Sequence, residues 1–137
     1  MNRNNIAGSY ADIHSLKRET KKSLVIDGVD INRGISMTGG TLEGYRNALT
    51  MYCRDGYEKI KQIEESLRNN DMQLFASHFH FLKNASAGIG AVRISGAAEN
   101  LELAGLSGDM EFVLWQTHIF LTELNKTLQC IDDALII

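Results

Sequence analysis

The chain contains no proline among its 137 residues, although it contains 12 glycines. Proline interrupts helices because it lacks a backbone N–H and clashes with the preceding turn. A chain without proline therefore suits long, uninterrupted helices that are joined by glycine turns. The length corresponds to about one domain, and a domain of this size can bury a core without disulfides or a bound metal.

Apolar residues recur every three or four positions along four stretches, which is the pattern of helices that bury one face. These four predicted long helices span about 41–67, 71–89, 92–104 and 109–135. A polar joint at 54–56 indicates a bend in the first of them. A short helix at 31–37, capped by Asp30, is predicted before the first long helix.

Four amphipathic helices with short links predict an all-α fold. We expect an antiparallel up-down four-helix bundle with a short N-terminal cap helix. Residues 1–22 are predicted to be a linker or an extra helix, and residues 23–137 to form the bundle domain.

Charge and composition exclude several classes of protein. Lys and Arg number 14 and Asp and Glu number 17, so the net charge is −3, which argues against binding to nucleic acid. No apolar run approaches the roughly 20 residues that span a bilayer, and the N-terminus lacks the apolar stretch of a secretory signal. We expect a cytoplasmic protein with no direct membrane contact. Cys53 and Cys130 have no metal-ligand spacing and are expected to be reduced thiols.

His80 has an unusual neighbourhood on the second long helix. Four residues share its face by helical spacing, namely Ala76, Lys83, Asn84 and Ala87. The opposite face is predicted to enter the core and carries Phe75, Phe79, Leu82, Ser86 and Ile89. The face of His80 therefore offers an accessible imidazole and an ammonium group, with no carboxylate on the same face.

An exposed imidazole is largely uncharged at neutral pH and can attack phosphorus without a base that first removes a proton. Lys83 would offset the charge of the transferred phosphoryl group. The alternative interpretation is a solvated helix face without a chemical role.

The other histidines are assigned no role. His78 and His80 lie about 200° apart around the helix, so they cannot bind one metal ion together. His118 has no carboxylate or second histidine one turn away, and His14 lies in the N-terminal lead. No phosphate-binding glycine loop follows a predicted strand. We therefore expect no ATP binding, no metal site and no cofactor.

Segment 80–91, with the sequence HFLKNASAGIGA, resembles the signature of histidine-containing phosphotransfer (HPt) domains. That signature reads His-x-Leu-Lys-Gly-x-Ser/Ala-x-x-Leu/Ile-Gly. Upstream, 29–34 and 39–45 resemble the beginning of the same family, and 94–102 resembles its third helix. The resemblance covers roughly residues 24–135.

The resemblance implies that His80 takes a phosphoryl group from the aspartyl phosphate of one receiver domain and passes it to the aspartate of another. Lys83 matches the lysine that lies beside the phosphoryl group. Ser86 matches a small position on the buried side, and Gly90 matches a close-packing glycine. Asn84 departs from the family pattern, which usually has glycine there. Its amide can donate and accept hydrogen bonds, so it would contact the phosphoryl group or a docked receiver, or narrow the approach.

The implied partners are response-regulator receiver domains, which we expect to dock on Gln73, Ala76, Asn84 and Ala87. Any Mg²⁺ would come with the receiver. We expect a monomer in isolation with no ATP-dependent activity of its own. The polar lead and the C-terminal helix end favour the C-terminal module of a hybrid sensor histidine kinase. The alternative function is a helical docking adaptor that binds receivers without phosphotransfer.

Overall fold

A computed structural model describes residues 24–136 of the chain. This part contains five α-helices and no β-strand: α2 (Ile31–Met37), α3 (Leu42–Arg68), α4 (Met72–Gly88), α5 (Val92–Ser107) and α6 (Met110–Leu135). The predicted all-α class is confirmed for these residues. The linker or helix expected at 1–22 lies outside the described residues.

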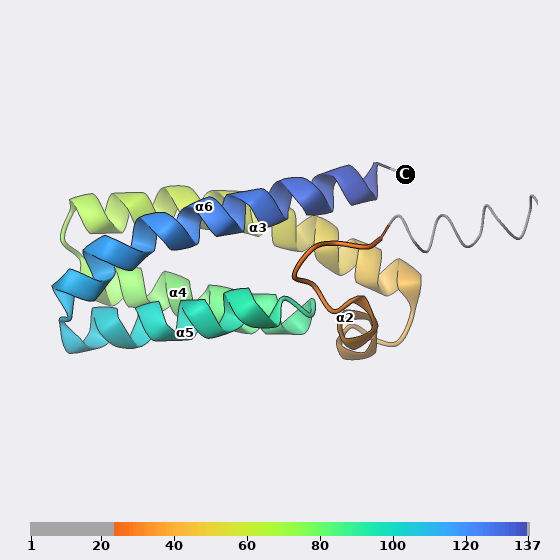
Figure 1. The fold of residues 1–137 in the computed structure, drawn as a ribbon, viewed down its shortest axis with the longest axis horizontal. Helices are drawn as coiled ribbons and strands as arrows, with labels where there is room; N and C mark the ends of the chain where they lie inside the picture. Colours follow the sequence, from red (N-terminus) through yellow and green to blue (C-terminus); the bar gives the residue numbers. More distant parts are fainter. Residues whose placement is uncertain (1–23, 137) are drawn as a thin grey trace, which may run out of the picture.

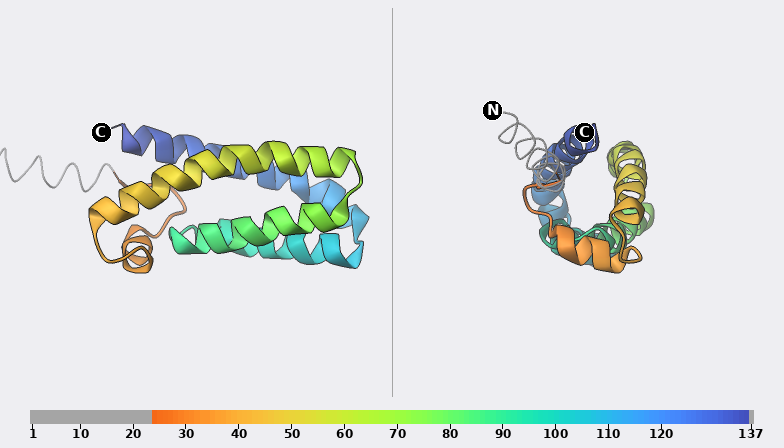
Figure 2. Two further views of the ribbon diagram at one scale, coloured as in Figure 1. Left: turned by 180° about the vertical axis from the view of Figure 1, so that it is seen from behind. Right: turned by 90° about the vertical axis from the view of Figure 1, so that its right-hand side faces the viewer.

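The four long helices extend along a common axis, and successive helices turn back at each connection (Figure 1). α4 contacts α3 and α5, and α6 contacts α5 and α3. The short α2 contacts α3 and α4 and lies across one end of the longer helices (Figure 2). No helix within residues 24–136 is both long enough and apolar enough to cross a membrane.

Side-chain caps set where α2, α3, α4 and α6 begin. The carboxylates of Asp30, Asp71 and Asp109 each accept a hydrogen bond from the backbone N–H three residues later, which satisfies one of the free donors of a first helical turn. The Thr41 hydroxyl does the same for α3. The polar joint at 54–56 lies within one continuous α3 and does not end it.

The core lies between the helices and consists of aromatic and aliphatic side chains. Tyr45, Phe75 and Phe79 are among the largest fully buried side chains. The ring of Phe79 meets that of Phe120 edge-on, with 5.0 Å between their centroids, a preferred geometry for aromatic pairs. Both cysteines are free thiols, with Cys53 buried and Cys130 exposed. This core fixes the orientation of α4 and therefore of the residues on its outer face.

Candidate functional site around His80

α4 has one face in the core and one face toward solvent. Phe75, Phe79 and Leu82 are completely buried, whereas the His80 side chain is 57% exposed and Asn84 is also exposed. The apolar face holds the helix in place, so the imidazole projects from a rigid element.

The C-terminal end of α4 is fixed by hydrogen bonds to two tyrosines of α3. The hydroxyl groups of Tyr52 and Ser86 lie 2.8 Å apart, and both side chains are buried. The Tyr45 hydroxyl donates to the carbonyl of Ile89 at 2.8 Å. Gly90 then turns the chain with a φ of 89°, a conformation that favours glycine. A side chain on Gly90 would also clash with the carbonyl oxygen of Asp30.

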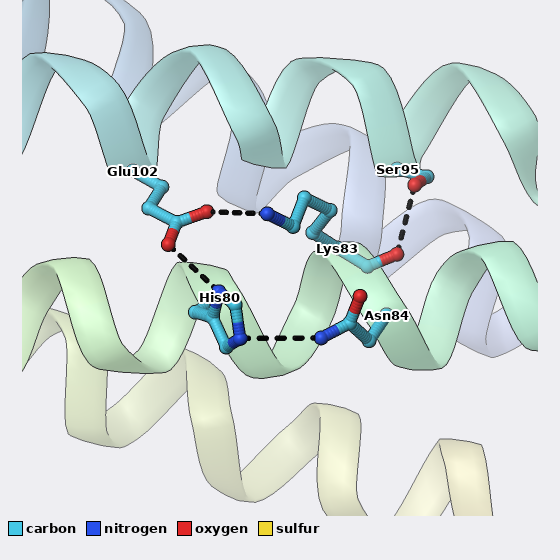
Figure 3. Close-up of polar contacts among 5 residues, drawn as sticks. All are labelled: His80, Lys83, Asn84, Ser95 and Glu102. Atoms are coloured by element: carbon cyan, nitrogen blue, oxygen red, sulfur yellow. Dashed lines mark hydrogen bonds and ion pairs between the residues drawn. The ribbon is translucent and has the colours of Figure 1, made fainter.

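Glu102 of α5 reaches across to the outer face of α4 and contacts two of its side chains (Figure 3). Its Oε2 atom lies 2.8 Å from Nδ1 of His80, and its Oε1 atom lies 3.0 Å from Nζ of Lys83. Ser95 of α5 also donates to the Lys83 carbonyl at 2.8 Å. The expectation that no carboxylate accompanies His80 is therefore wrong, because the carboxylate comes from another helix. Glu102 lies within the segment that resembles the family's third helix, but no spacing in the sequence links it to His80.

The carboxylate determines which imidazole nitrogen carries the proton. A carboxylate only accepts hydrogen bonds, so Nδ1 of His80 must be the donor and the neutral ring has its lone pair on Nε2. Asn84 lies one turn further along α4, with its Nδ2 3.4 Å from that Nε2. Desolvation alone would raise the pKa of Glu102, but the hydrogen bonds from Lys83 and His80 outweigh it and hold this pKa below its usual range. Glu102 is therefore a carboxylate at neutral pH.

The residues predicted to form a docking face do not all lie on the surface. Gln73 and Asn84 are exposed and Ala87 is half-buried. Ala76 is 3% exposed, so its assignment to the docking face is wrong. The reason is close packing of α4 on α5, where a Cβ added to Gly105 would lie 3.6 Å from the Cβ of Ala76.

The other two histidines of the described residues, His78 and His118, lie apart from this site. His78 is buried, with Nδ1 3.1 Å from Nζ of Lys59 on α3. His118 is exposed on α6, and His14 lies outside the described residues. Burial, followed by the Lys59 ammonium, lowers the pKa of His78. His78 therefore remains uncharged in the fold at neutral pH.

The site is open to solvent, because the side chains of His80 and its neighbour Asn84 are both exposed. Among the described residues, a surface cavity of about 380 Å³ is lined by α5, α6 and the segment at Asp27–Gly28, and His80 does not line it. An imidazole on an open helix face can react only with a group that another molecule brings to it. Fold and site together define a helical module whose histidine is presented to a partner.

Comparison with known families agrees with this class. The sequence model described as Hpt domain matches residues 47–135, more than half of the 137 residues. The chain therefore belongs to the Hpt domain family, whose members carry out histidine phosphotransfer in two-component signalling and interact with receiver domains of response regulators. Searches of curated proteins and of solved structures gave no significant match.

Proposed function

We propose that this domain is a phosphorelay intermediate that receives a phosphoryl group on Nε2 of His80 from a receiver aspartate and passes it to another receiver aspartate. The observation that carries this proposal is the pairing of the exposed His80 ring with Glu102. The pairing leaves the lone pair on the ring nitrogen that does not face the carboxylate.

In the forward step the Nε2 lone pair attacks the phosphorus of the aspartyl phosphate. The N–P bond forms as the P–O bond to the aspartate breaks, and the aspartate leaves as a carboxylate with the electron pair of that bond. The ring becomes more positive, and the Nδ1 proton remains hydrogen-bonded to Glu102, whose negative charge stabilises the product. The second transfer is the reverse reaction with another receiver. Mg²⁺ would be held by the receiver.

Lys83 supplies electrostatic support for this transfer. Its ammonium group is bound to Glu102 and its side chain is 25% exposed, so it can exchange the carboxylate for a phosphoryl oxygen by rotating its flexible stem. Receivers would dock on the surface of Gln73, Asn84 and Ala87, with Asn84 beside the reacting nitrogen.

We further propose that the helices form the antiparallel up-down bundle expected of such modules, with α2 as the cap. The module would act as a cytoplasmic monomer without ATP-dependent activity of its own, within a hybrid sensor histidine kinase.

The test is to mix the protein with candidate receivers that carry a labelled aspartyl phosphate. We expect an acid-labile label on the wild type, a phosphorus NMR signal of the Nε2 isomer, and complete loss of the label in His80→Gln. His118→Gln is the matched control because His118 is an exposed histidine on another helix, and it should keep the label. A label that persists in His80→Gln would refute the assignment. Receiver binding without a label, unchanged in His80→Ala, would instead identify a docking adaptor.

A further inference from the structure

Asn84 is placed so that it contacts the reacting atom itself. Its Nδ2 lies 3.4 Å from Nε2 of His80 (Figure 3). In the neutral ring Nδ1 is the nitrogen that donates to Glu102, so Nε2 has the lone pair, and only the N–H side of the amide can form a favourable contact with it. The two hydrogen bonds therefore specify one orientation of the ring and one of the amide.

From this geometry we infer that the Asn84 amide gates Nε2 before transfer and holds the phosphoryl group after it. The inference rests on the proposed function, which it deepens. In the resting state the amide donates to the lone pair that must attack phosphorus, and this weak contact breaks when a receiver delivers the phosphoryl group.

After transfer, phosphorus occupies the position of the amide hydrogen, so the side chain of Asn84 must rotate aside. It cannot move far away, because residues four apart on a helix have their Cβ atoms about 5–6 Å apart. The displaced N–H then meets an oxygen of the phosphoryl group, which is negatively charged. Hydrogen bonds to charged groups are stronger than those between neutral groups, so the contact that weakly blocks the nucleophile becomes one that stabilises the phosphohistidine.

Lys83 does not perform this role in the resting structure. Its Nζ atom is bound to Glu102, which lies on the Nδ1 side of the ring. The amide of Asn84 is already on the Nε2 side. A phosphoryl group on Nε2 therefore meets the Asn84 amide first, and Lys83 only after it leaves Glu102.

The experiment measures how long the phosphohistidine survives without any receiver. Phosphoramidate phosphorylates the protein chemically, and peptide mapping restricts the measurement to His80. The variants are Asn84→Leu, which keeps the branched shape of the side chain without the donor, and Asn84→Gly, which removes the side chain. We expect the lifetime to fall about tenfold in both variants, as for loss of one hydrogen bond to a charged group.

Each other outcome is decisive. A short lifetime in Asn84→Gly alone would mean that bulk shields the phosphoryl group, and it would overturn the role of the amide, as would unchanged lifetimes in both variants. The resting contact has its own measurement, the nitrogen-15 shift of Nε2 in the unphosphorylated protein. We expect this shift to differ between wild type and Asn84→Leu. Equal shifts would refute the contact between the Asn84 amide and Nε2 in the unphosphorylated protein. Failure of receivers to label the wild type would refute the proposed function, while these two measurements would still test Asn84.

Discussion

His78 and His80 stand two residues apart on α4, yet neighbouring helices give them opposite partners. His78 is 7% exposed and lies against Lys59 of α3, with 3.1 Å between Nδ1 and Nζ. The side chain of His80 is 57% exposed and lies against Glu102 of α5, with 2.8 Å between Nδ1 and Oε2. The helical twist of about 200° over two residues separates the two environments.

The partners give the two rings opposite tautomers. An ammonium group only donates, so Nδ1 of His78 accepts and its proton resides on Nε2. A carboxylate only accepts, so Nδ1 of His80 donates and its lone pair resides on Nε2. The lone pair of His78 therefore accepts a hydrogen bond from Lys59 inside the protein, whereas the lone pair of His80 lies at the surface. The reactivity of a histidine on α4 is therefore determined by the helix that faces it.

The largest expected effect comes from giving His80 the kind of partner that His78 has. Glu102→Lys would place a cation at Nδ1, move the ring proton to Nε2 and repel Lys83. We expect phosphoryl transfer from a receiver to slow by about 100-fold or more, the range that positioned proton-handling groups contribute. Rapid-quench measurement of labelled protein checks this rate.

Glu123→Lys on α6 is the control, because it makes the same charge change at an exposed position and should leave the rate unchanged. Equal slowing in both variants would attribute the effect to net charge rather than to the tautomer of His80.

A smaller effect is expected from removing the ammonium group of Lys83. Lys83→Met keeps the apolar stem and loses the charge, so transfer should slow by about tenfold. The expected slowing is smaller than the 100-fold or more that follows removal of an oxyanion donor from an enclosed site, because the Lys83 side chain is partly exposed. Lys59→Met removes the ammonium group beside His78 and should leave the transfer rate unchanged. The helical circular dichroism of Lys83→Met should match the wild type, and a loss of helix would show a structural role instead.

The sequence predicts those features of α4 and its histidines that depend on a single helix, namely where the helix lies and which of its residues face the core. Helical spacing and the N-caps Asp71 and Asp109 locate α4 and α6 closely. The same spacing places Phe79 and Leu82 in the core and His80 on the opposite face. These features follow from the period of one helix and from local capping, so no tertiary information is needed to predict them.

The contacts between helices could not be predicted in this way. Periodicity shows which residues share a face of one helix, but the residue that faces them from the next helix depends on how the two helices pack. Gly105 allows α5 to approach α4 closely, which buries Ala76, and Glu102 of the same helix lies beside His80. The burial of Ala76 and the carboxylate at His80 are therefore both consequences of α4–α5 packing.

The smallest expected effect is a pH dependence of stability that arises from His78. Burial and then Lys59 lower its pKa in the fold, against a weaker opposite effect of Asp71, while the unfolded chain keeps the ordinary value near 6.5. Below about pH 6.5 the unfolded state therefore binds more protons, and the free energy of unfolding falls as the pH drops toward the lowered pKa. The slope is limited to one proton, about 1.4 kcal/mol per pH unit. Urea unfolding at pH 7.5 and 5.5 measures it.

His78→Gln isolates this contribution, because the side-chain oxygen of glutamine can still accept from Lys59 but does not titrate. The wild type should lose more stability than His78→Gln between the two pH values, and the variant should still accept the phosphoryl group. Glu102, whose pKa is lowered, loses its stabilising contribution only at more acidic pH, below the ordinary carboxyl range, so it does not obscure the comparison. Parallel losses in the two proteins would mean that the ring of His78 takes up its proton as readily in the fold as in the unfolded chain.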